Sequence, residues 1–168
     1  WLMKAVAVSD PLGDLSQPDP LPSDAYRLYS LHGGSARGRL VGGNLSLLAH
    51  MMGTPWAPDL KDSILFLEDV NEAPYRVDRM LTQLIISGGM SKCRGVVVGH
   101  FTRGDDSSPD SEWKTADVLR DRLAGLGIPV TVGWAVGHVR TKLTMPLGVQ
   151  AELDADRLTL KILEPAVS

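Results

Sequence analysis

The stretch from Ser63 to Ser87 constrains the fold of this chain more than any other. Residues 64–67 are an unbroken run of apolar side chains, which is typical of a short strand covered on both faces. Residues 75–87 follow with apolar side chains at helical spacing, and Pro74 suits the first turn of a helix. Two glycines then end that helix. A buried strand that leads directly into a crossover helix indicates an α/β protein with parallel strands.

The same alternation of strand and helix continues towards the C-terminus. Residues 95–100 predict a second buried strand, and residues 129–133 predict a third. Between them, residues 112–125 predict a helix that Ser111 can cap. The side chains expected on its buried stripe are Ala116, Leu119, Leu123 and Leu126. We therefore expect a β-α-β-α-β core of parallel strands joined by right-handed crossovers.

Antiparallel strands are expected to flank this core. Residues 149–153 and 158–162 alternate apolar and polar side chains on either side of a short turn, which is typical of a β-hairpin. Residues 26–32 and 39–41 also indicate short strands, separated by a glycine-rich turn at 33–38. The predicted fold class is α/β, with a parallel core, flanking antiparallel strands and a hairpin.

The N-terminal residues differ from the rest of the chain. Residues 1–8 resemble the end of a helix or a connector, and residues 10–24 hold four prolines and several acids. We interpret 10–24 as a surface loop without packed elements. The chain is thus divided into a connector with a Pro-rich loop at 1–24 and one domain at 25–168.

Composition and charge argue against several classes of function. The 168 residues carry a net charge of −3, which gives no reason to expect nucleic acid or a membrane surface as a partner. Cys93 is the only cysteine, so no internal disulfide can form. No apolar run could span a bilayer, and the first residues lack a signal-peptide layout. The chain does not begin with Met, and we therefore expect a fragment or a processed product.

Acidic and imidazole side chains follow the predicted parallel strands, at the sheet edge where α/β proteins collect catalytic groups. Glu68 comes directly after the first of these strands, and His138 comes shortly after the third. A Glu that accepts a hydrogen bond from one ring nitrogen would leave the other nitrogen to act as a general base. His100 ends the second strand, and spacing alone does not choose between the two histidines. The alternative is an exposed acid and a loop histidine that share no function.

A nucleophile and a metal site lack such support. There is no G-x-S-x-G elbow, because Ser35 is not followed by a helix and Ser46 lies inside one. Cys93 lies between two basic residues, but its place in what reads as a surface connection favours a spectator thiol. The strand-end acids and histidines could bind a metal in principle, although no HxxxH or CxxC spacing is present.

A second candidate site lies in the glycine-rich segment 33–44. Two arginines and a Gly-Gly pair lead to Asn44, the expected N-cap of a short helix, where free amides could bind phosphate or carboxylate. The spacing matches neither the P-loop nor the dinucleotide fingerprint, so close packing is the favoured reason for these glycines. The alternative functions are a non-catalytic module that binds an anionic ligand through 33–44, and a purely structural or partner-docking domain.

Five segments, taken in order, resemble a known family. They are GRLVGGNLSLLAHMMGTPW (38–56), ILFLEDVNEAPYRVDRMLTQL (64–84), VVVGHF (96–101), PVTVGWAVGH (129–138) and MPLGVQAELD (145–154). Together they resemble the C-terminal domain of the LD-carboxypeptidases, which include the muramoyltetrapeptide carboxypeptidases and the microcin-immunity peptidases. The resemblance extends over residues 25–163 and implies a swivelling β/β/α-like domain.

The resemblance implies an activity and its site residues. Members of this family are serine peptidases with a Ser–Glu–His triad and no metal or other cofactor. They release the terminal D-alanine from murein tetrapeptides during cell-wall recycling in the bacterial cytoplasm. The Glu of the family's L-E-D motif falls on Glu68, and the His that precedes its late P-L-G motif falls on His138. The position of His100 does not carry the catalytic His in the family.

The chain departs from the family because it begins where the C-terminal domain begins. The N-terminal domain, which supplies the serine and the oxyanion hole, is missing from it. We therefore expect this chain to need that domain as a partner and to be inactive alone. The surface left by the missing domain should be apolar, and a homodimer could form through it.

Overall fold

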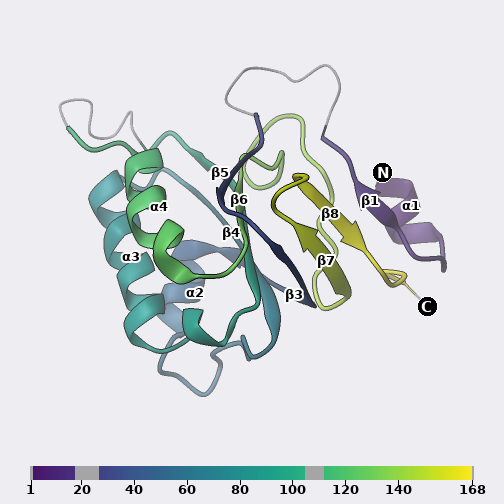
Figure 1. Cartoon of the computed structure of the whole chain (residues 1–168), viewed down its shortest axis with the longest axis horizontal. Coiled ribbons are helices and arrows are strands. Elements are labelled where there is room, and N and C mark those ends of the chain that lie inside the picture. The colour runs from purple at the N-terminus through teal and green to yellow at the C-terminus, as the bar shows by residue number, and fades with distance from the viewer. Residues whose placement is uncertain (1, 18–26, 105–111, 168) are drawn as a thin grey trace.

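The computed structural model describes residues 2–17, 27–104 and 112–167. Within them, eight strands form one mixed sheet in the order β1-β8-β7-β3-β4-β5-β6-β2, and α2, α3 and α4 lie together on one face of it (Figure 1). The strands are β1 (Gly13–Leu15), β2 (Tyr29–His32), β3 (Ser35–Asn44), β4 (Ser63–Val70), β5 (Gly95–Thr102), β6 (Val130–Val132), β7 (Gln150–Asp154) and β8 (Thr159–Ile162). The helices are α1 (Leu2–Ala7), α2 (Leu45–Met51), α3 (Pro74–Ile86) and α4 (Thr115–Leu123), with short 3-10 turns at Met90–Lys92 and Ala124–Leu126.

The parallel core confirms the predicted fold class. Strands β3, β4, β5 and β6 run parallel to one another, with α3 between β4 and β5 in the sequence and α4 between β5 and β6. The predicted hairpin is also confirmed, because β7 and β8 pair antiparallel and β7 then pairs antiparallel with β3. Antiparallel strands close both edges, with β1 on β8 and β2 on β6.

Strand β4 is buried on both faces, as its unbroken apolar run predicts. Leu65 and Leu67 belong to the apolar cluster beneath the helices, whereas Ile64 and Phe66 belong to a second cluster on the other face. Helix α3 packs onto the first cluster through its buried residues Val77, Leu81 and Leu84. Because both faces of β4 are covered, its carboxyl end is held firmly at the rim of the sheet.

The second cluster includes parts of the N-terminal segment, which corrects one expectation. Residues 10–24 were expected to contain no packed elements, but Leu12 and Leu15 are buried and β1 pairs with β8. A strand of three residues is too short to show periodicity, and its partner lies near the other end of the chain. The remainder of that predicted loop, 18–24, lies outside the described residues.

Strand β3 is longer than the predicted strand 39–41. The expected turn at 33–38 extends only to Gly34, and β3 then runs between β4 and β7. Gly38 lies inside β3, at a position where a Cβ would collide with the carbonyl oxygen of Asp62. A Cβ at Gly42 would collide with the backbone of Phe66. These glycines permit close approach of neighbouring strands. A sequence pattern does not distinguish glycines with this role from glycines that form a turn.

Helix α4 begins later than the predicted helix, and most of its predicted buried stripe is confirmed. Its N-cap is Lys114, whose backbone amide donates to the carboxylate of Asp117 at 3.0 Å. Ser111, the predicted cap, lies outside the described residues. Ala116 was expected in the core but is exposed, and Val118 is buried instead. Leu119 and Leu123 are buried as predicted, and Leu126 packs against the same apolar cluster.

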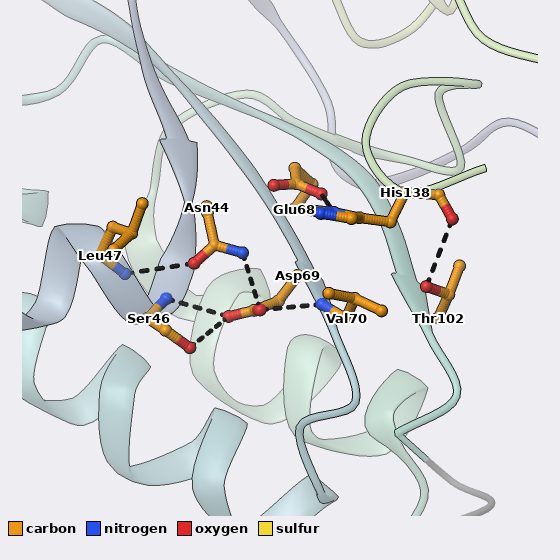
Figure 2. A network of polar contacts seen from close by, with 8 residues as sticks. All are labelled: Asn44, Ser46, Leu47, Glu68, Asp69, Val70, Thr102 and His138. Atoms are coloured by element: carbon orange, nitrogen blue, oxygen red, sulfur yellow. Dashed lines mark hydrogen bonds and ion pairs between the residues drawn. The ribbon is translucent and has the colours of Figure 1, made fainter.

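The carboxylate of Asp69 ties the start of α2 to the end of β4 (Figure 2). It accepts hydrogen bonds from Nδ2 of Asn44 at 2.8 Å, from the amide and hydroxyl of Ser46 at 2.9 and 2.7 Å, and from the amide of Val70 at 2.8 Å. Asn44 in turn accepts from the amide of Leu47 at 3.2 Å, which confirms it as the N-cap. Asp69 is buried, so these four donors replace its hydration.

We expect Asp69→Ala to lower the free energy of unfolding by about 3 kcal/mol, because it leaves several buried donors without an acceptor. Urea unfolding followed by circular dichroism measures this. Asp14→Ala, on the exposed face of β1, is the control and should change the free energy by less than about 0.5 kcal/mol. Equal stabilities of the two variants would contradict a structural role for Asp69.

Candidate active site

Glu68 and His138 meet at the rim formed by the carboxyl ends of β4 and β6. Glu68 lies near the end of β4 and is 6% exposed, and His138 lies in the loop that follows β6. Nδ1 of His138 is 2.7 Å from Oε2 of Glu68 (Figure 2). The structure therefore brings together the two side chains that the sequence predicted would meet at one sheet edge.

The alternation of side chains along β4 places Glu68 on the face where His138 arrives. Glu68 follows Ile64 and Phe66 at intervals of two residues, so it shares their face, opposite the helices. Asp69 falls on the other face, where it binds the start of α2. Adjacent carboxylates thus serve different partners because successive side chains of a strand point in opposite directions.

The hydrogen bond defines the state of the imidazole. A carboxylate can only accept, so Nδ1 of His138 carries the proton and Nε2 has its lone pair available when the ring is neutral. The side chain of His138 is 54% exposed, whereas that of Glu68 is 8% exposed. A buried acceptor with an accessible ring is the arrangement of an orienting residue and a general base.

Gly137 allows the loop to approach Glu68. Its φ of +102° lies in the region that favours glycine. A Cβ at this position would lie 2.6 Å from Oε2 and 2.9 Å from Cβ of Glu68. Any side chain here would therefore displace the carboxylate that holds His138.

The other histidines have different surroundings. Burial lowers the pKa of His100, and a hydrogen bond with the backbone of Gly133 opposes this effect. His50 contacts the carbonyl of Ser46 at 2.5 Å within α2, and His32 contacts the carbonyl of Ala124 at 3.2 Å. His138 is the histidine that the described contacts join to Glu68.

The candidate nucleophiles of the sequence have structural contacts. The hydroxyl of Ser46 donates to Asp69, as described above. Cys93 was expected in a surface connection but is only 6% exposed, and burial raises the pKa of its thiol. A raised pKa disfavours the reactive thiolate. Neither side chain contacts Glu68 or His138 in any described interaction.

The glycine-rich segment 33–44 contains the whole of β3, and its described contacts have structural roles. Arg37 forms an ion pair with Glu152 of β7, and the glycines at 38 and 42 are required for close packing.

Across the described ranges, no group of three or more His, Cys, Asp or Glu side chains could hold a metal ion. Across the same ranges, no helix has the length and apolar character needed to cross a bilayer.

Gln17 is a residue that the sequence analysis did not single out. Its side chain reaches the loop between β6 and His138, with Nε2 2.7 Å from the carbonyl oxygen of Gly133 and Oε1 2.8 Å from the amide of Ala135. These contacts span more than a hundred residues of sequence. No local pattern marks a polar residue in a Pro-rich segment for such a contact.

Comparisons with known proteins show which family the chain resembles. Residues 37–153 match the C-terminal domain of the LD-carboxypeptidase family, peptidase S66. The probable murein peptide carboxypeptidase of Bacillus subtilis is 36% identical over 141 residues, which cover 84% of this chain and 44% of the relative. The crystal structure of muramoyltetrapeptide carboxypeptidase from Oxalobacter formigenes has 39% identity and a TM-score of 0.69, and the match covers 81% of this chain and 49% of that protein. A structure of MccF in complex with glutamyl sulfamoyl guanosine has 30% identity and a TM-score of 0.73, over 85% of this chain and 42% of MccF.

The chain spans less than half the length of these relatives. The matched family segment nevertheless extends over most of the chain and includes Glu68 and His138. On these grounds the chain belongs to the LD-carboxypeptidase family, of which it carries the C-terminal domain.

Proposed function

We propose that this chain is the C-terminal part of a serine LD-carboxypeptidase that releases the terminal D-alanine from murein tetrapeptides. In this proposal Glu68 and His138 supply two members of a Ser–Glu–His triad, and an N-terminal domain supplies the serine. The observation that carries the proposal is the 2.7 Å contact between Nδ1 of His138 and the buried Glu68 carboxylate at the sheet rim.

The proposed mechanism uses each group in one role. His138 accepts the proton of the serine hydroxyl at Nε2 as the hydroxyl attacks the carbonyl of the terminal peptide bond. It then gives that proton to the leaving amino group of D-alanine, and a water molecule is activated in the same way to release the acyl group. Glu68 holds the ring in the productive tautomer and stabilises its charged form.

The exposure of His138 supports the need for a second domain. A hollow of about 390 Å³ between α2 and α3 is lined by Ser46, Arg76 and Arg79 among others, but neither Glu68 nor His138 contributes to it. The side chain of His138 is 54% exposed, so solvent water reaches the ring in this chain. The relatives are about twice as long, and their additional residues could cover this rim.

The choice of murein peptides as substrate rests on the names of relatives. One relative is named for murein peptides, and another was solved with glutamyl sulfamoyl guanosine. We favour murein tetrapeptides because the proteins named for murein peptides and for muramoyltetrapeptide, at 36% and 39% identity, are more similar to this chain than MccF at 30%.

Substitution of Glu68 or His138 tests the proposed Ser–Glu–His triad. In the full-length protein we expect His138→Ala and Glu68→Ala each to lower kcat by about 10³-fold or more, because members of a triad act as a unit. Release of D-alanine from an L,D-linked tetrapeptide measures the rate.

The matched control is His32→Ala, at the opposite end of the sheet beside Val130, which should retain near-normal turnover. Normal hydrolysis by His138→Ala would overturn the assignment. His100→Ala should cost far less than His138→Ala, because the described contacts of His100 do not include Glu68.

The 168-residue chain alone should release no measurable D-alanine, because a general base without a nucleophile or oxyanion donors provides little catalysis. Adding the separately produced N-terminal domain of the full-length protein should restore turnover, and the His138→Ala form of this chain should not. Turnover by the purified chain without that domain would contradict the proposal.

The space beside Gly137 gives an independent test. Gly137→Ala should lower kcat by about 10²-fold, because the new methyl group displaces Glu68 and so misplaces His138. Gly88→Ala is the control, since it also has a positive φ but no heavy atom close to the added Cβ. Equal activity of the two variants would contradict the displacement of Glu68 by the added methyl group.

A further inference from the structure

The loop that carries His138 contains buried backbone groups that need hydrogen-bond partners. Residues 133–138, here called the His138 loop, continue from the end of β6 to the rim of the sheet. Gly133, Ala135 and Val136 are buried, so their backbone groups need partners within the protein. Beyond Val132 the loop no longer pairs with β5 in regular register, and these partners must come from elsewhere.

A β-bulge in β5 supplies one side of the loop. Leu67 pairs with Val98 and Asp69 pairs with Phe101, so two residues of β5, Gly99 and His100, lie opposite Glu68 alone. The amide of His100 donates to the carbonyl of Val136 at 3.1 Å. The carbonyl of Val98 accepts from the amides of Gly133 and Trp134 at 3.0 and 3.2 Å. A Cβ at Gly99 would lie 2.7 Å from the oxygen of Val136, so this approach requires glycine.

Gln17 supplies the other side. Its carboxamide donates to the carbonyl of Gly133 at 2.7 Å and accepts from the amide of Ala135 at 2.8 Å. These two backbone groups belong to residues i and i+2, which is the pair that a neighbouring strand would bind. The side chain of Gln17 therefore takes the place of a strand along this edge of the His138 loop.

We propose that Gln17 is a positioning residue for His138. The inference rests on the proposed function, because it gives Gln17 a role in holding the proposed general base. The loop is held by β5 on one side and by Gln17 on another, and His138 follows Ala135 by three residues. The amide of Leu143 also donates to the carbonyl of Ala135 at 2.7 Å, and the hydroxyl of Thr102 to the carbonyl of His138 at 3.5 Å. A catalytic ring must keep its geometry within about 0.5 Å, so loss of one side of this support should loosen the contact with Glu68.

The protonation of the His138 ring reports this role without any turnover. In the 168-residue chain, long-range ¹H–¹⁵N NMR shows which ring nitrogen carries the proton. We expect the unsubstituted chain to hold the Nδ1–H tautomer, and Gln17→Ala to lower its fraction by about twofold or more. Gln17→Glu has nearly the same shape but places a carboxylate oxygen against the carbonyl of Gly133, and it should have the same effect if Gln17→Ala does not fold.

Two control variants accompany the measurement of the His138 tautomer. Glu68→Ala removes the acceptor of Nδ1–H and should abolish the preference for this tautomer. Gln83→Ala, an exposed glutamine of α3, should leave the spectrum of His138 unchanged. In the full-length enzyme, Gln17→Ala should lower kcat about tenfold and change KM by less than about twofold, because it disturbs the base and not the binding of substrate.

The possible failures are distinct. An unchanged tautomer ratio in both Gln17 variants, together with a changed ratio in Glu68→Ala, would overturn the positioning role and leave the triad intact. Full activity of His138→Ala would overturn the proposed function, whatever the Gln17 variants show. A loss of the Nδ1–H tautomer in both Gln17 variants, with an unchanged Gln83→Ala, would support the inference.

Discussion

The hydrogen bond between Nδ1 of His138 and the carboxylate of Glu68 joins side chains that are 70 residues apart in the sequence. Its geometry depends on three strand ends at once. β4 fixes the acceptor because both of its faces are buried, β6 leads into the loop that carries the ring, and the bulge in β5 makes room for that loop. Glycine at position 137 lets the loop approach Glu68, since any Cβ there would occupy the space of the carboxylate.

Two adjacent carboxylates at the end of β4 show how a strand separates function from stability. Asp69 is buried against α2, and its carboxylate accepts hydrogen bonds from four donors. These bonds hold the end of β4 against the start of α2. Glu68 points to the other face and has an imidazole as its partner. The two-residue period of a strand produces this division without any further element. A shift of one residue in the register of β4 would exchange the two roles and disrupt both networks.

The dyad is assembled entirely within this chain, although the chain spans less than half of its relatives. The orientation of the ring is therefore set by the sheet, its bulge and the N-terminal segment, and does not wait for a second domain. In the proposed enzyme, docking of the N-terminal domain would have to place only the serine and the oxyanion donors against a base that is already oriented. Such preorganisation reduces the entropy that must be lost when the reacting groups come together.

The sequence by itself determined the parallel core and the hairpin, and it predicted a meeting of Glu68 with a histidine as one of two alternatives. These features follow from short periodic patterns, and parallel strands must end at one rim. Residue patterns left His100 and His138 as alternatives, and resemblance to a family favoured His138. The tertiary structure decided what depends on distant partners: β1 on β8, the glycines at 38 and 42, the bulge opposite Glu68 and the contact of Gln17 with the His138 loop. A local pattern records which face of an element is apolar, but it carries no record of which backbone atoms from elsewhere in the chain will come within hydrogen-bonding distance.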